Sequence, residues 1–377
     1  MRLLTLISLA AGAYIFWRAV WPLRCGWAGK TLLGLLLLAV GLFFQIMRAI
    51  GGPQPFAPDV PGWLNLALSW GYMSYMAYFL GLVGCQLISC LVLNLAPAWR
   101  ALPRENKRSY ANAAHLLLLV AAMLLVGIGE YNALKPPAVK ELVLELPVRK
   151  PLKIALLTDL HADAIKRQDF IRRVVELTNE QQPDLVLIVG DFVDGSVAQR
   201  GAELAPLREL QAPAYAVPGN HEYYSGYTEW APFLASLGLH MLHNEHLLLD
   251  THGIVLAGVT DPAARVFGLE APDIDKALAG APEGAPIILL AHQPQIARMA
   301  EPAGVALQLS GHTHGGLMPG LAQITAAFNC GFVEGLYHTG RMLLYVSPGT
   351  SLWSGIPLRL GVPSEITLIT IAPFASK

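Results

Sequence analysis

The first third of the chain is a succession of long apolar stretches. A transmembrane helix needs about 20 mostly apolar residues, and four stretches approach or exceed this length. They cover residues 3–20, 31–47, 63–95 and 115–128, the last reaching full length only if it extends from about 110 to 131. The third suits one tilted helix, or a helix followed by a re-entrant piece. We therefore expect a helical membrane domain of about four spans over residues 1–132.

The pattern changes after residue 132, where short apolar runs alternate with segments of helical periodicity. Near-continuous apolar strands separated by helices are typical of sheets covered by helices in an α/β architecture. Strands are predicted over residues 140–148, 152–161, 184–195, 214–224, 253–262, 286–294 and 305–316, and helices over 168–181, 204–210, 228–237 and 273–279. Further strands follow residue 341. This predicts a second, water-soluble domain over residues 133–377.

Most of these apolar runs end in a short cluster of Asp, Asn or His. Open α/β sheets bind ligands at the carboxyl ends of their strands, so clusters far apart in sequence are expected to converge. The candidate ligands are Asp159, His161, Asp191, Asn220, His292, His312 and His314. Carboxylate and imidazole donors without a thiolate suit Mn, Fe or Zn. So many donors exceed the needs of one ion and fit two ions that share a carboxylate, an arrangement that catalyses phosphoryl displacement.

Each cluster taken alone also has a purely structural interpretation. An Asp-x-His is most often a surface turn, a Gly-Asp is often a turn or a helix N-cap, and a lone His such as His292 is more often a hydrogen-bonded structural residue. The Gly-rich "GHTHGG" at 311–316 suits a mobile loop. Five clusters in order, each at the end of an apolar run, favour a metal centre over five separate coincidences.

The ordered set "TDLH…GD…GNHE…AH…GHTHGG" resembles the calcineurin-like metallophosphoesterase superfamily. The wording "GNHEYYSG" and the tail "SPGT…GIPLRLGVPSEITLITI" are similar to a subgroup of membrane-attached bacterial phosphoesterases and transmembrane proteins with a metallophosphoesterase domain. The resemblance covers about residues 139–371. It implies a β-sandwich flanked by helices, in four α/β/β/α layers, with a two-metal site at one edge.

The resemblance also implies a ligand scheme. One metal takes Asp159, His161, Asp191 and His314, and the other takes the bridging Asp191, Asn220, His292 and His312. His221 matches the family's non-ligand histidine, which protonates the leaving oxygen or steadies charge on the phosphoryl group. The implied mechanism is in-line attack by a metal-activated hydroxide. Glu222 stands where many members have Asp, a departure that removes no ligand.

Composition and charge sharpen the membrane prediction. Charged residues make up 14% of the chain, against roughly 25% in an ordinary soluble domain. The net charge of −1 gives no basic field for nucleic acid, so a nuclease is disfavoured.

Lys and Arg concentrate in the first and third of the loops between the predicted spans. By the positive-inside rule this places the catalytic domain outside the cytoplasm, on what we expect to be a bacterial inner membrane. A second crossing by the third stretch reverses this orientation.

The spans carry no Asp, Glu, Lys or Arg in their interior, so an anchor or lipid-contacting platform is favoured over a pump. The expected activity is hydrolysis of a phosphodiester or pyrophosphate, plausible for a lipid or envelope glycolipid. A broad phosphomonoesterase, or a transporter or sensor with a non-catalytic phosphoesterase-like domain, is the alternative.

Three features bear on the substrate. The apolar segment 317–332 is either a hydrophobic lip for a lipid tail or, as we favour, a buried strand and turn. Tyr223 is expected either to line the pocket or to pack in the core. Arg359 is a candidate phosphate contact, with a surface arginine as the favoured alternative.

Overall fold

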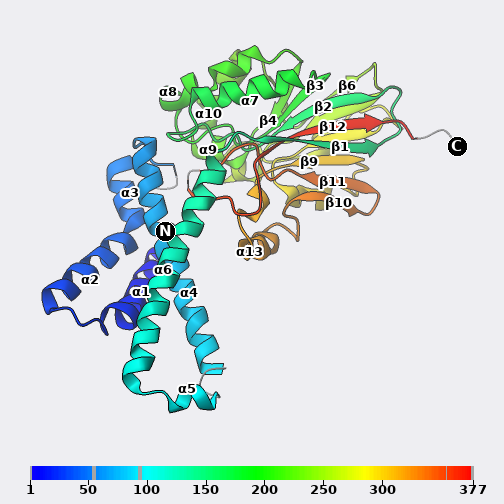
Figure 1. Cartoon of the computed structure of the whole chain (residues 1–377). Helices are drawn as coiled ribbons and strands as arrows, with labels where there is room; N and C mark the ends of the chain where they lie inside the picture. The colour runs from blue at the N-terminus through cyan, green and yellow to red at the C-terminus, as the bar shows by residue number, and fades with distance from the viewer. Residues whose placement is uncertain (1, 53–56, 92–95, 354, 375–377) are drawn as a thin grey trace. The chain divides into compact units, whose positions relative to one another are not determined.

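The computed structural model describes residues 2–52, 57–91, 96–353 and 355–374 (Figure 1). Two compact units emerge, Met1–Tyr131 and Asn132–Lys377. Each is described by itself.

The first unit is built from helices, as expected. They are α1 (Arg2–Ile15) with the π-helical turn η1 (Phe16–Val20), α2 (Trp27–Gly41), α3 (Phe43–Gly51), α4 (Gly62–Leu91), α5 (Pro97–Ala101) and α6 (Arg104–Leu134). Among the residues that the structure describes, three helices are long and apolar enough to cross a membrane, or up to four if the bent pair α2 and α3 counts as one span. The predicted second span is therefore not one straight helix, because the chain bends by 62° between α2 and α3.

The third and fourth apolar stretches each form one helix. Helix α4 runs unbroken to Leu91, and the end of the predicted stretch, 92–95, lies outside the described residues. Helix α6 has 31 residues, so the fourth stretch reaches spanning length. Aromatic side chains hold the unit together: the Phe43 ring stacks on Tyr72 with centroids 4.6 Å apart, and the Tyr72 hydroxyl lies 2.8 Å from Ser8 Oγ.

The second unit contains two six-stranded sheets. The first has the order β1-β12-β2-β3-β4-β5 and the second β10-β11-β9-β8-β7-β6. The bounds are β1 Ala138–Glu145, β2 Leu152–Leu157, β3 Leu185–Val189, β4 Ala214–Val217, β5 His240–Met241, β6 Glu245–Leu249, β7 Ile254–Gly258, β8 Ile287–Leu290, β9 Leu307–Ser310, β10 Gly335–Thr339, β11 Met342–Val346 and β12 Glu365–Ala372. Strands β2 to β5 pair in parallel, as do β7, β8, β9 and β11.

The sheets pack face to face, since one buried cluster joins Ile154 and Leu187 of the first sheet to Leu256 and Leu309 of the second. Helices α7 (Gln168–Glu180) and α10 (Tyr227–Ser236) cover the outer face of the first sheet (Figure 1). The short helices α11 (Ile274–Leu278) and α12 (Ala297–Ala300) cover the other sheet. The predicted helix-flanked β-sandwich is confirmed.

The strands are shorter than the apolar pattern predicted. Each core strand stops before its polar cluster, because carboxylates and imidazoles leave the sheet to form loops. The predicted strand over 214–224 ends at Val217, and α9 (Asn220–Tyr224) takes its remainder. The predicted helix over 204–210 is the 3-10 helix η3 (Gly201–Glu209).

The favoured prediction of a buried strand over 317–332 is wrong. This segment contains α13 (Leu321–Phe328), none of whose residues is buried; the exposed fractions of Ile324 and Phe328 are 56% and 80%. A short apolar run cannot be assigned to a strand or a helix by hydrophobicity alone, and apolarity does not guarantee burial.

Candidate metal centre

The loops that follow β2, β3, β4, β8 and β9 bring the predicted ligands to one edge of the sandwich. Most of these side chains are withdrawn from solvent: Asp159 and His161 have exposed fractions of 0%, and Asp191 of 2%. Burial of so many ionisable groups is costly unless they are paired or bind ions.

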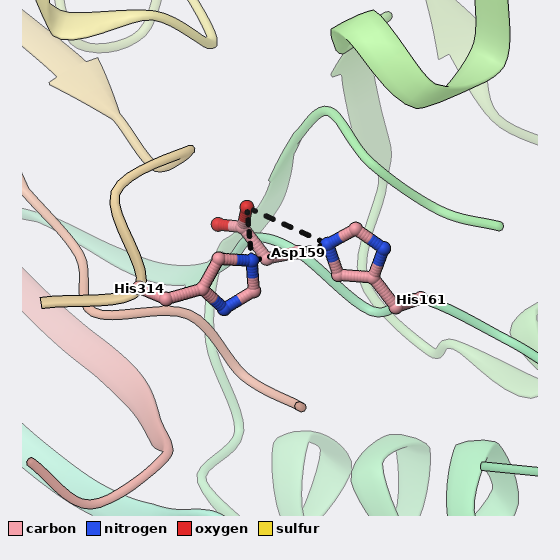
Figure 2. A group of neighbouring side chains, drawn as sticks. All are labelled: Asp159, His161 and His314. Carbon is pink, nitrogen blue, oxygen red and sulfur yellow. Dashed lines mark hydrogen bonds and ion pairs between the residues drawn. The ribbon is translucent and has the colours of Figure 1, made fainter. Parts of the chain in front are cut away.

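One group consists of Asp159, His161 and His314, whose donor atoms face a common point (Figure 2). Nε2 of His314 lies 3.5 Å from Asp159 Oδ1, and Nε2 of His161 lies 4.0 Å from the same oxygen. The two imidazole nitrogens lie 3.1 Å apart. This spacing suits an ion held between two imidazoles and a carboxylate.

A second group consists of Asp191, His292 and His312. Asp191 Oδ2 lies 3.0 Å from Nε2 of His292 and 3.7 Å from Nε2 of His161. One carboxylate therefore reaches both groups. Nδ1 of His292 lies 2.8 Å from the carbonyl oxygen of Val189, which orients the ring so that Nε2 faces the site.

Backbone conformation confirms that this edge is unusual. Five of the candidate ligands have a positive φ: Asp159 (54°), His161 (42°), Asp191 (55°), His312 (72°) and His314 (48°). Such conformations cost roughly 1–3 kcal/mol each in non-glycine residues and cluster at functional sites. These backbone conformations turn the side chains toward one another, which regular strand geometry would not do.

Two glycines of the sequence motifs provide space for carboxylates. A Cβ atom at Gly219 would lie 2.2 Å from Asp191 Oδ1, and one at Gly311 would lie 2.3 Å from Asp159 Oδ2. Any other residue at either position would displace a candidate ligand.

The donor set fits divalent ions. Asn220 Oδ1 is buried with no hydrogen-bond partner within the described part of the chain, as expected of an oxygen meant for a metal. Burial lowers the pKa of His312 to about 3 and that of His314 well below its usual range, so both rings are neutral and have a lone pair to donate. Burial raises the pKa of Asp159, which favours a compensating positive charge beside it.

Asp194 is a functional candidate that sequence reasoning missed. Its Oδ2 lies 3.0 Å from Nδ1 of His161 and its Oδ1 lies 2.5 Å from Nδ1 of His221. Burial opposes ionisation of Asp194, but the two imidazoles beside it hold its pKa far below the usual range. The signal was the second acid of "GDFVDG", three residues after Asp191.

Glu222 connects the loops. Its Oε2 accepts from the backbone N–H of Asp191 at 3.0 Å and of Gly219 at 2.7 Å, and its Oε1 accepts from Phe192 N–H at 2.7 Å. Burial and the nearby Asp191 carboxylate raise its pKa to about 7. The carboxyl group therefore fixes the loops that carry Asp191 and Asn220.

The two predicted substrate contacts have different surroundings. Tyr223 is 2% exposed and packs against Tyr227, with ring centroids 4.5 Å apart. Of its two predicted positions, lining the pocket or packing in the core, it therefore has the second. The exposed aromatic ring near His221 is Tyr224, with centroids 5.4 Å apart.

Arg359 is 1% exposed, so the favoured surface location is wrong. Its guanidinium donates to the carbonyls of Pro348 at 2.8 Å and Ser351 at 2.5 Å, and Nη2 lies 3.4 Å from Nδ1 of His314. The hydrophobic pattern of the sequence does not predict this burial, because it does not show that the loop after β11 surrounds the Arg359 side chain.

The segment that contains α13 begins and ends at the metal-centre loop. It follows the short 3-10 helix η6 (His314–Gly316), and a Cβ atom at Gly316 would lie 2.5 Å from the backbone of Ala322. Its far end returns to the same loop, because Thr313 Oγ1 donates to the carbonyl of Val333 at 2.5 Å. An exposed apolar helix therefore adjoins the candidate site.

Comparisons with known proteins agree with this geometry. Residues 152–316 match the family model described as calcineurin-like phosphoesterase. An uncharacterized metallophosphoesterase of Helicobacter pylori is 37% identical over 339 residues, covering 82% of this chain and 89% of the relative. A transmembrane protein with metallophosphoesterase domain from Danio rerio is 35% identical, covering 82% of this chain and 74% of the relative. The chain belongs to the calcineurin-like metallophosphoesterase family and is a metal-dependent phosphoester hydrolase.

Proposed function

We propose that the centre holds two divalent ions and hydrolyses a phosphodiester or pyrophosphate. Asp159, His161 and His314 hold one ion, Asn220, His292 and His312 hold the other, and Asp191 is shared. The observation that carries this assignment is the position of Asp191 Oδ2 within 4 Å of a histidine of each group. Bound divalent ions lower the pKa of water and neutralise phosphoryl oxygens.

In this proposal His221 is the general acid. Nδ1 of His221 is occupied by Asp194, so Nε2–H is the donor left for a leaving oxygen. Burial opposes protonation, but Asp194 and Asp191 raise the pKa of His221 to about 9, which keeps the ring protonated at neutral pH. Its side chain is 16% exposed, which leaves access for substrate.

We infer that the physiological substrate carries an apolar tail, as a lipid or envelope glycolipid does. The support is α13, which presents Ile324 and Phe328 to the surroundings beside the His314 loop.

The candidate membrane spans support location in a membrane, and the loop charges favour a catalytic unit outside the cytoplasm. The complete donor set argues against a non-catalytic sensor. A phosphomonoester remains the alternative substrate.

Metal analysis combined with hydrolysis of bis-p-nitrophenyl phosphate tests the two-metal proposal. We expect two equivalents of Mn, Zn or Fe per chain, loss of turnover in chelator, and recovery when one of these ions is restored. Undiminished hydrolysis by metal-free protein, or one equivalent at full activity, would contradict it.

A headgroup-release assay on native lipid extracts tests the substrate. The double variant Ile324→Ser with Phe328→Ser should lower the ratio of lipid turnover to bis-p-nitrophenyl phosphate turnover. Val143→Ser, at a 66% exposed residue of β1, is the matched control. An unchanged ratio in the α13 variant would exclude α13 from lipid recognition. A topology reporter fused after Lys377 tests the orientation.

A further inference from the structure

The helical unit contains an apolar cavity that the phosphoesterase chemistry does not use. The cavity has a volume of about 410 Å³, within the roughly 300–1,000 Å³ typical of small-molecule sites. Its walls come from five helical segments of this unit, and the lining residues include Ile15 of α1, Val20 of η1, Leu37 of α2, Ser74 of α4 and Leu119 of α6.

The lining identifies the chemistry of an occupant. Hydrocarbon and aromatic side chains predominate, and the polar members of the lining are Ser74, Tyr75, Tyr78, Asn112 and His115. A mainly apolar surface holds ordered water poorly, because each water needs two to four polar partners. Hydrocarbon is therefore the occupant that the walls accept.

The rim indicates where the occupant comes from. Leu36 and Leu116 line the cavity and are 58% and 64% exposed. Both helices are candidate membrane spans, α2 as part of its bent pair with α3, and in a bilayer the medium at that rim would be lipid hydrocarbon. An acyl chain enters the cavity without crossing water.

One polar group inside the cavity lacks a partner. Ser74 is 4% exposed, and its Oγ has no hydrogen-bond partner within the described ranges. A buried unpaired hydroxyl is unfavourable in an apolar environment. An ester oxygen of a lipid would accept from it, whereas a pure hydrocarbon would not.

We propose that this cavity binds one acyl chain of a bilayer phospholipid. The site is separate from the metal centre, since every residue that lines it belongs to Met1–Tyr131. The inference is independent of the proposed substrate.

Gly71 allows a direct test. It lines the cavity, and a Cβ atom added there meets nothing within 4 Å, so Gly71→Leu places a side chain in open space. Gly84 lies on the same helix and likewise has nothing within 4 Å, but does not line the cavity. Gly84→Leu is therefore a matched control.

Full-length protein, delipidated in mild detergent, is titrated with palmitoyl-oleoyl phosphatidylglycerol and followed by native mass spectrometry. Wild type and Gly84→Leu should each retain one phospholipid, and Gly71→Leu should fall to background. Elution profile and Tm check the fold, and Ala19→Leu, at another lining residue, replaces Gly71→Leu if that variant does not fold. No retained lipid in wild type, or equal retention in the cavity variant, would overturn the proposal.

Discussion

Oδ1 of Asp194 lies 2.5 Å from Nδ1 of His221, while the other oxygen of the same carboxylate lies 3.0 Å from Nδ1 of His161. One buried acid thus orients both the proposed general acid and a candidate metal ligand. Carboxylates that hold such imidazoles in one tautomer typically contribute 10–100-fold to metal affinity or activity.

Asp194→Asn should therefore lower kcat by about 10–100-fold, since the amide no longer stabilises a protonated His221. The alkaline limb of the pH–rate profile, where His221 loses its proton, should move toward lower pH, because Asp194 is one of the groups that raise the pKa of His221. The measurement is kcat against pH, together with metal content. Asp275→Asn, at an exposed acid, is the control; equal profiles in both variants would remove Asp194 from the mechanism.

The His221→Ala variant should retain its metal but lose turnover, by about 10²–10⁴-fold for substrates whose leaving group is an alcohol of high pKa. The loss should be smaller with p-nitrophenyl esters, because p-nitrophenolate needs less protonation. Turnover of both substrate types and metal analysis check this prediction. The exposed His338→Ala is the matched control. Full activity with normal metal content would exclude the role.

Asp191→Asn and Asn220→Ala should differ in metal stoichiometry. Asp191 Oδ2 lies near a histidine of each group, so its substitution should weaken the binding of both ions. The loss of Asn220 should weaken the binding of only one ion. Elemental analysis after dialysis distinguishes the two patterns. Loss of only one equivalent from Asp191→Asn would show that this carboxylate does not bridge.

Glu222→Gln should destabilise the loops around the centre. The Oε2 atom serves two backbone N–H groups and Oε1 a third, and an amide has only one oxygen to accept with. Each buried donor left without an acceptor costs about 1–3 kcal/mol. Thermal unfolding should show a lower Tm than for Glu283→Gln, at an exposed site. A Tm equal to the control would show that the three bonds are dispensable.

Lys166 gives a pH-dependent prediction for stability. It is 2% exposed, and burial lowers its pKa from 10.5 to about 7, although Asp163 acts in the opposite direction. Between these values the unfolded chain binds more protons than the folded one, so this group makes stability increase as pH rises from about 7 toward 10.5. The slope is at most about 1.4 kcal/mol per pH unit.

Lys166→Met should remove that slope. The free energy of unfolding of this variant, measured at pH 7, 8 and 9, should therefore exceed that of wild type at pH 7, and the difference should become smaller as the pH rises. Lys150→Met, at an exposed lysine, should keep the wild-type slope. Parallel curves for wild type and Lys166→Met would show that Lys166 stays charged in the fold.

The sequence by itself determined the apolar N-terminal helices, the helix-covered sandwich and the family. Apolar runs specify buried strands, and polar residues that interrupt them must leave the sheet, so the clusters at Asp159, Asp191 and His292 had to follow strand ends. The family also follows from the ordered motifs, because their residue types and order are local facts of the chain.

Only the tertiary structure decided which of these groups face one another. The Asp194 carboxylate meets His161 and His221 because the loops after three different strands, β2, β3 and β4, approach one another, and no spacing in the sequence encodes these distances. The same holds for the burial of Arg359 and the exposure of α13, which depend on what packs above each segment. Local pattern sets where a residue leaves a strand; long-range packing sets what it then contacts.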